Sequence, residues 1–267
     1  MSQSHLAQWF MNSISKKINK KIRHYWRVPK TILQYNLDSQ DASERYIFHH
    51  IPKCGGTSAV DALTNWFVVL KDYPLGWSAQ DDPVIYQQFC DRPKNLDRLK
   101  PYQLLVGHYH SAGSYIDRRY PNWQKKGYHL FTFLRDPLEL QISLYYFDIR
   151  NHRISADTPI EQRLLMRQNF IANIMRCHES NYISVLKQYS FIGIMEKYQE
   201  SFDRLSQLMG KPPVKLKIYN ESPRQQYSLS DDFIAEFKAH NQLDYKIYNH
   251  CKNYFNRQCD RLQIKTS

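Results

Sequence analysis

Five short apolar runs, separated by longer and more polar stretches, constrain the fold of this chain more than any other feature of its sequence. The runs are RYIFHHI at 45–51, YQLLVGHY at 102–109, YHLFTFL at 128–134, YSFIGIM at 189–195 and VKLKIYN at 214–220. Each is rich in aromatic and β-branched residues. Several are continuously apolar instead of alternating, which is typical of strands buried on both faces of a parallel sheet. The spacing therefore predicts a sheet of about five buried strands.

Helical patterns occupy the stretches between these runs. They are predicted at Thr57–Lys71, at Pro137–Arg150, from Thr158 towards Cys177, at Tyr198–Met209, after Ser230 and at Leu243–Phe255. The segment Thr-Pro-Ile-Glu at 158–161 matches a capping box with proline in the first turn, so a helix is expected to begin there. Strands that alternate with helices predict an α/β fold, with a central parallel sheet flanked by helices. A chain of 267 residues suits one such domain.

The N-terminal segment differs in composition from the rest. The chain has a net charge of +12, and residues 1–37 contain seven Lys or Arg and no acid. Within that segment Phe10, Ile14, Ile18, Ile22 and Trp26 recur every four residues among lysines. This pattern predicts a basic amphipathic extension over 1–37, followed by the main domain over 38–267. The helix either packs on its own domain or contacts a membrane surface, a partner or a polyanion.

The cysteine content and the hydropathy of the chain indicate the cellular compartment in which the protein would reside. Five cysteines without CxxC spacing argue against a disulfide framework or a zinc site, and favour a reducing compartment. No apolar run is long enough to span a bilayer, and the first residues do not match a secretory signal. We therefore expect a cytoplasmic protein, with peripheral membrane attachment left open.

The stretch HIPKCGGTS, after the first apolar run, has the composition of an anion-binding loop. Gly55 and Gly56 would let the backbone approach an anion closely, Thr57 and Ser58 add hydroxyls at a helix N-terminus, and Lys53 adds a positive charge. The nucleoside-triphosphatase motif GxxxxGK[ST] occurs nowhere in the chain. The usual magnesium–triphosphate arrangement therefore has no matching sequence, and no metal is expected.

Two further motifs follow other apolar runs. In TFLRDPLELQISLYYF, Arg135 stands where a strand should end, and Ser143 lies eight residues later, about two helical turns, so both could hold a second phosphate. In LLVGHYHSAG, His108 and His110 follow the second run.

Together these motifs resemble the carbohydrate sulfotransferases that use 3′-phosphoadenosine 5′-phosphosulfate (PAPS), in the branch of the heparan sulfate 2-O- and 6-O-sulfotransferases and their bacterial relatives. The resemblance covers about residues 44–257, although only the two binding motifs and Gly-His are specific. It implies a nucleotide-kinase-like fold of the P-loop type. It also implies that Lys53 and the loop Cys54, Gly55, Gly56, Thr57 and Ser58 hold the 5′-phosphosulfate. Arg135 and Ser143 would hold the 3′-phosphate.

The same resemblance implies catalytic roles and a substrate class. His108 would deprotonate the acceptor, with His110 as the alternative base, and Lys53 would stabilise the leaving nucleotide. The acceptor would be a hydroxyl of a carbohydrate, either a polysaccharide or a glycolipid. The chain departs from the family where Cys54 replaces the usual threonine, which removes a hydroxyl. It also departs near YNESPRQQY, the stretch in which Arg224 would contact the 3′-phosphate.

Two other classes of function remain as alternatives. The basic N-terminus and the 20 tyrosines suggest a module that binds nucleic acid or another polyanion, but no RRM, zinc-finger or helix-turn-helix signature supports it. The other alternative is a non-catalytic nucleotide- or polyanion-binding protein on the same fold. The presence of Lys53, Arg135, Ser143 and His108 argues against such decay.

Overall fold

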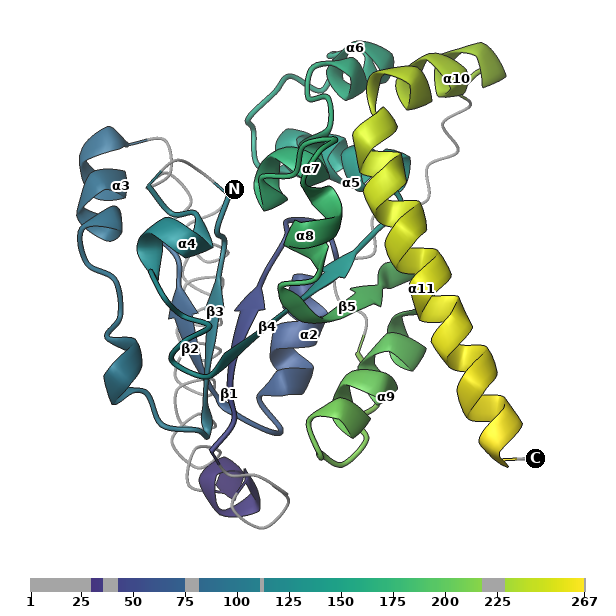
Figure 1. Cartoon of the computed structure of the whole chain (residues 1–267). Coiled ribbons are helices and arrows are strands. Elements are labelled where there is room, and N and C mark those ends of the chain that lie inside the picture. Colours follow the sequence, from purple (N-terminus) through teal and green to yellow (C-terminus); the bar gives the residue numbers. More distant parts are fainter. Residues whose placement is uncertain (1–29, 36–42, 75–81, 111–112, 218–228, 267) are drawn as a thin grey trace, which may run out of the picture.

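The centre of the molecule is a five-stranded sheet in which every neighbouring pair of strands is parallel. The computed structural model describes residues 30–35, 43–74, 82–110, 113–217 and 229–266. The strands are β1 (Arg45–His49), β2 (Val68–Asp72), β3 (Gln103–Gly107), β4 (Tyr128–Leu134) and β5 (Tyr189–Ile194). Their order in the sheet is β2-β3-β1-β4-β5 (Figure 1). The predicted α/β fold with a central parallel sheet flanked by helices is confirmed.

One edge of the sheet differs from the prediction. The helix expected over Thr57–Lys71 ends early, since α2 is Gly56–Leu63, and the chain then forms β2, which was not predicted. The run Trp-Phe-Val-Val-Leu at 66–70 is rich in aromatic and β-branched residues, which favour a strand. Pairing with β3 over five residues supplies the hydrogen bonds that a longer helix would have made internally.

The run VKLKIYN is not a strand in its described part. Residues 211–217 have no regular secondary structure, and residues 218–220 lie outside the described residues. The side chain of Gln199 provides the hydrogen bonds that a neighbouring strand would otherwise supply: it donates to Val214 O at 3.1 Å and accepts from Leu216 N at 2.9 Å. The apolar side chains of Val214 and Leu216 pack on the core, which explains the strand-like pattern.

Helices fill the connections between the strands. They are α2, α3 (Pro83–Cys90), α4 (Ile116–Arg119), α5 (Pro137–Arg150), α6 (Ile160–Leu165), α7 (Phe170–Met175), α8 (Tyr182–Leu186), α9 (Tyr198–Leu208), α10 (Asp231–His240) and α11 (Gln242–Thr266), with short 3-10 turns η2 (Leu96–Arg98) and η3 (Met195–Lys197). Helix α5 has the predicted bounds, and the side chain of Ser230 caps α10 as expected. Figure 1 shows α11 passing alongside β5 at one edge of the sheet.

The single helix predicted from Thr158 towards Cys177 is instead two helices, α6 and α7. Neither Thr158 nor any other described side chain caps α6, so the predicted capping box is wrong. The chain breaks at Asn169, whose φ of 48° is left-handed. Its side-chain oxygen accepts from the backbone N–H groups of Leu243 and Asp244, while the Asp244 carboxylate accepts from two N–H groups of α7. This reciprocal capping with α11 stabilises the break between the two helices. Because it depends on a contact far along the chain, local sequence patterns do not reveal it.

Two apolar layers enclose the sheet. On one face, side chains of β1, β3 and β4 pack against α2 and α9. On the other face, Ile47, Leu105 and Leu130 pack against Tyr109, Tyr120 and Trp123. Because the sheet is covered on both sides, the carboxyl ends of its strands are the natural place for a ligand.

Most of the predicted N-terminal extension lies outside the described residues. Residues 30–35 are helical, and the ring of Tyr35 packs 5.6 Å from that of Phe67, with the ammonium of Lys211 3.5 Å from the Tyr35 centroid. The division at residue 37 stays a prediction. In the ranges that the structure covers, no helix has both the length and the apolar character needed to cross a membrane.

Candidate active site

The strand order predicts where a ligand should bind. The chain leaves β1 towards β2 at one edge, and it leaves β4 towards β5 at the other, so the connections diverge between these neighbouring strands. Ligands of open α/β sheets bind in the crevice at such a point, outside the carboxyl ends of the strands. A cavity of about 570 Å³ lies there.

Residues from all three predicted motifs line this cavity. They are Lys53, Gly55, Gly56, Thr57 and Ser58 after β1, His108 and His110 after β3, and Arg135 and Ser143 after β4. The three motifs are far apart in the sequence, yet the parallel sheet brings them together because each follows a strand at the same edge. Arg224 lies outside the described residues.

The loop after β1 has the shape required to present a helix N-terminus to the cavity. Lys53 and Gly55 have left-handed φ values of 66° and 75°. A Cβ on Gly55 would also lie 2.6 Å from the sulfur of Met195 and 2.8 Å from the ring of Tyr198. The Tyr198 hydroxyl donates to the Gly55 carbonyl at 2.5 Å, which holds the loop. Helix α2 then begins at Gly56, and a helix N-terminus attracts anions.

Lys53 lines the cavity and forms no salt bridge with a described residue, although the charge of Asp148 acts on it. Its ammonium lies 4.5 Å from the centroid of the Phe147 ring. Burial, together with the nearby charges of Arg150 and Arg135, lowers the pKa of Lys53 to about 8. A group in this environment gains from a bound anion, because the anion would replace the water lost on burial.

Arg135 lies just before Asp136, the N-cap of α5, and Ser143 lies in the second turn of that helix. The Asp136 carboxylate caps this helix by accepting from two backbone N–H groups, and Pro137 occupies its first turn. Arg135 donates to Glu139 at 3.1 Å, with about a quarter of its side chain exposed, while Ser143 is buried. Both line the cavity, so together they offer it a charged group and a hydroxyl.

Unlike its neighbours in the loop after β1, Cys54 does not line the cavity. Its side chain lies in the core with 1% exposure and does not line the cavity, and its backbone N–H donates to Ile51 O at 3.4 Å. Burial raises the pKa of its thiol far above the usual range. The position of its side chain therefore does not support the expectation that Cys54 contributes to the anion site of the loop. Its neighbours Lys53 and Gly55 do line the cavity.

His108 has the geometry of a base. Its Nδ1 lies 2.7 Å from the carbonyl oxygen of His50, which can only accept, so Nδ1 carries the proton and Nε2 keeps a lone pair. Burial and the neighbouring His110 lower the pKa of His108 to about 4. The imidazole is therefore neutral near pH 7. Burial also lowers the pKa of His110, whose ring lies 5.7 Å away.

Other cavity residues were missed by the sequence reasoning. They include Phe147, Asp148, Arg153, Arg167 and Tyr86. His50 also lines the cavity, whereas its place just before the loop left open whether it faces a ligand or lies buried in the strand. Phe147 and Asp148 lie one helical turn beyond Ser143, so the helical period could have revealed them. Arg153 and Arg167 come from connections around α6, where no motif marks them.

The acid in this set is already engaged. Asp148 is 2% exposed, hydrogen-bonds with Arg163, and lies 3.9 Å from a guanidinium nitrogen of Arg153. Lys53, Arg135, Arg153 and Arg167 are the basic residues that line the cavity. The cavity wall is therefore cationic, which favours anionic ligands.

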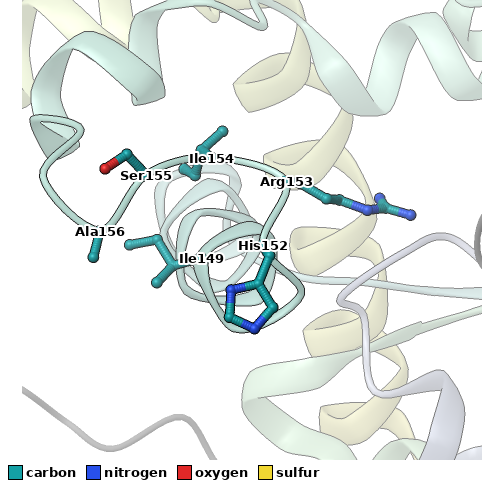
Figure 2. A pocket seen from close by; sticks show the side chains of 6 residues that line it. All are labelled: Ile149, His152, Arg153, Ile154, Ser155 and Ala156. Atoms are coloured by element: carbon teal, nitrogen blue, oxygen red, sulfur yellow. The ribbon is translucent and has the colours of Figure 1, made fainter.

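A second hollow of about 450 Å³ lies beside the connection between α5 and α6. Ile149, His152, Arg153, Ile154, Ser155 and Ala156 line it. In Figure 2 the side chain of Arg153 points away from those of Ser155 and Ala156. Because Arg153 lines both hollows, this connection serves the main cavity by supplying a guanidinium.

The described residues contain no cluster of three or more His, Cys, Asp or Glu side chains that could hold a metal ion.

Comparisons with known proteins return distant structural matches. No family model matches the chain, and no curated protein matches it either. A sulfotransferase from Alicyclobacillus acidocaldarius shares 13% identity, with a TM-score of 0.48 over 78% of this chain and 94% of the other. The mouse sulfotransferase SULT7A1, in a complex with PAP, shares 11% identity, with a TM-score of 0.42 over 77% of this chain and 65% of the other. These matches are too distant to assign the chain to a family.

Proposed function

We propose that this protein is a sulfotransferase that moves a sulfuryl group from PAPS to a hydroxyl of a carbohydrate. The observation that carries the proposal is the meeting of three groups in one cavity: the N-terminus of α2 with Lys53, the pair Arg135 and Ser143, and the neutral His108. The first two suit the two ends of a nucleotide that bears phosphate at both its 3′ and 5′ positions. The third suits an incoming hydroxyl. The cavity volume also falls in the range of roughly 300–1,000 Å³ that small-molecule sites occupy.

The proposed chemistry is an in-line displacement at sulfur. The acceptor oxygen forms a bond to sulfur while the bond between sulfur and the bridging oxygen of the nucleotide breaks. His108 takes the acceptor's proton on Nε2, and the leaving group departs as 3′-phosphoadenosine 5′-phosphate. Lys53 offsets the charge that develops on the bridging oxygen, since its ammonium lies on the loop that presents α2. No step requires a metal.

The charge of the cavity wall indicates which kind of carbohydrate would be the acceptor. Arg167 lines the cavity, and its guanidinium makes no ion pair or hydrogen bond with any residue that the structure describes. Burial and the charges of Arg163 and Arg153 lower its pKa, so an anion beside it would relieve this repulsion. We therefore favour an acidic carbohydrate acceptor over a neutral one.

The first experiment measures nucleotide binding by calorimetry. The 3′,5′-bisphosphate product should bind, and Arg135→Gln should weaken binding by about 1.5–3 kcal/mol, the value of a charged hydrogen bond. Arg98→Gln is a matched control, because Arg98 is exposed in η2 at the amino end of β3, opposite to the cavity. A protein that prefers AMP, which lacks the 3′-phosphate, would contradict the assignment of Arg135.

The second experiment tests transfer. Labelled PAPS is offered with a panel of acidic and neutral glycans and with tyrosine peptides, and the product is located by mass analysis. Transfer to acidic glycans, reduced by Arg167→Gln, is expected. Transfer to tyrosine alone would overturn the acceptor class. Tight bisphosphate binding without transfer to any acceptor would favour the non-catalytic nucleotide-binding alternative.

We also propose a cytoplasmic location, with membrane or partner contact through residues 1–37. The four cysteines whose side chains are described, Cys54, Cys90, Cys177 and Cys251, are free thiols, which suits a reducing compartment. Fractionation of cells that produce the full chain and a chain lacking residues 1–29 would test both parts.

A further inference from the structure

Three aromatic side chains form a row across the carboxyl edge of the sheet. Gly107 of β3 is in register with Asp72 of β2 on one side and with His49 of β1 on the other. The residue that follows β2 is Tyr73, the residue that follows β3 is His108, and the residue that follows β1 is His50. The ring of His108 lies 4.6 Å from that of Tyr73 and 4.4 Å from that of His50. The row therefore follows from strand register, and it places His50 beside the proposed base.

The two histidines of this row receive different hydrogen bonds. The backbone carbonyl of His50 accepts a hydrogen bond from Nδ1 of His108. Nε2 of His108 is therefore left as an acceptor. Nδ1 of His50 instead lies 3.2 Å from the hydroxyl of Tyr73. Burial raises the pKa of Tyr73, so this hydroxyl keeps its proton. A phenol is a stronger donor than an imidazole N–H, and a bare imidazole nitrogen is the stronger acceptor. The hydroxyl therefore donates to Nδ1, and Nε2 of His50 carries the proton.

The Nε2 edge of His50 faces the start of α2. A Cβ built on Gly56, the first residue of that helix, would lie 1.6 Å from this nitrogen. His50 lines the cavity, and no described residue hydrogen-bonds with its Nε2. An N–H donor with no described partner thus lies against the N-terminus of α2, on a residue that lines the cavity, where an anion is expected.

We propose that His50 is a second catalytic residue, which donates a hydrogen bond from Nε2 to an oxygen of the sulfuryl group as it is transferred. Tyr73 is a positioning residue that fixes the tautomer of His50. This inference rests on the proposed function. It assigns opposite roles to two neighbouring histidines, because His108 accepts a proton while His50 stabilises the charge that builds on the sulfuryl oxygens.

The sharpest test uses a pair of amides at position 50. His50→Gln places an amide N–H near the position of Nε2, whereas His50→Asn places its amide near Nδ1 and does not reach the cavity. Neither change removes the backbone carbonyl that holds His108. Loss of one such donor typically lowers kcat by about 10²–10³-fold. We expect a loss of that order in His50→Asn and a loss of less than roughly tenfold in His50→Gln. Equal turnover in wild type and His50→Asn would overturn the role.

A second test needs no turnover. The bisphosphate product lacks the sulfuryl group, so His50→Asn should weaken PAPS binding relative to bisphosphate binding by about 3–10-fold, the value of one hydrogen bond. An unchanged ratio would overturn the inference while leaving the proposed function intact. A wild-type protein that binds neither nucleotide would overturn both.

Nitrogen NMR of the imidazole rings tests Tyr73 directly. We expect His50 protonated on Nε2 and His108 protonated on Nδ1 in the free protein. Tyr73→Phe keeps the ring that packs on His108 but removes the donor, so His50 should become a mixture of tautomers and kcat should fall. A His50 protonated on Nδ1 in the wild type would refute the assignment, and so would a Tyr73→Phe spectrum identical to it.

Discussion

Replacing Gly56 with alanine tests the packing on which the site depends. The added Cβ would lie 1.6, 1.9 and 2.3 Å from three atoms of the His50 ring, whereas ordinary contacts begin near 3.4 Å. The ring would have to move by about 1.8 Å to restore such a contact. It has little room, because the ring of His108 lies 4.4 Å away and the Tyr73 hydroxyl holds Nδ1.

The cost follows from these contacts. Overpacking of this kind costs about 1–3 kcal/mol, and the hydrogen bond to Tyr73 is worth about 0.5–1.5 kcal/mol more. Alanine recovers roughly 0.5–1 kcal/mol through its greater helix propensity. We therefore expect Gly56→Ala to lower the free energy of unfolding by about 0.5–4 kcal/mol.

A double-mutant cycle separates the clash from every other effect. In a His50→Ala background the ring is absent, so Gly56→Ala should be neutral or stabilising there. The measurement is urea unfolding of the four proteins at matched m-values. An equal cost in both backgrounds would show that the His50 ring does not lie against Gly56, and the placement of Nε2 would fail with it.

Three further predictions concern pH, the edge of the sheet and the buried thiol. His108 has a pKa of about 4 when folded and about 6.5 when unfolded, so its contribution to stability is complete above pH 6.5 and is lost as the pH falls. Between pH 7 and pH 5 the free energy of unfolding should fall in the wild type. In His108→Gln this fall should be smaller by about 2 kcal/mol. Arg119→Met should cost about 3–5 kcal/mol in urea unfolding, because it leaves the buried Asp72 carboxylate without its bidentate partner. Adding Asp72→Asn should recover part of this loss, and no recovery would argue against a direct ion pair. Cys54 should react with iodoacetamide far more slowly in the native protein than in urea, and equal rates would contradict its burial.

Local patterns of the sequence predicted the parts of the site that depend on a few neighbouring residues. The glycines and lysine before α2, and the Arg-Asp-Pro entry to α5, each specify a turn and a helix start through short-range geometry. Because both turns follow apolar runs that form strands, their meeting at one edge of the sheet could also be expected. The same local reasoning placed Cys54 in the loop, where only packing shows its side chain in the core.

Other features depend on contacts between distant segments. The sequence after Leu63 suits either a longer helix or a strand, and pairing with β3 decides for β2. Gln199 likewise satisfies the backbone near Val214, so that an apparent strand stays outside the sheet. Arg167 reaches the cavity only through the break between α6 and α7, which reciprocal capping with α11 maintains.

The sequence by itself determined the alternation of strands and helices and the chemical groups at three strand ends, because these follow from periodicity and turn chemistry within a few residues. Only the tertiary structure decided how these groups face one another. The row of Tyr73, His108 and His50 requires the register of three strands, and neither tautomer can be read without it. Hydrogen bonds and ring contacts between strands far apart in the chain determine which nitrogen accepts and which donates.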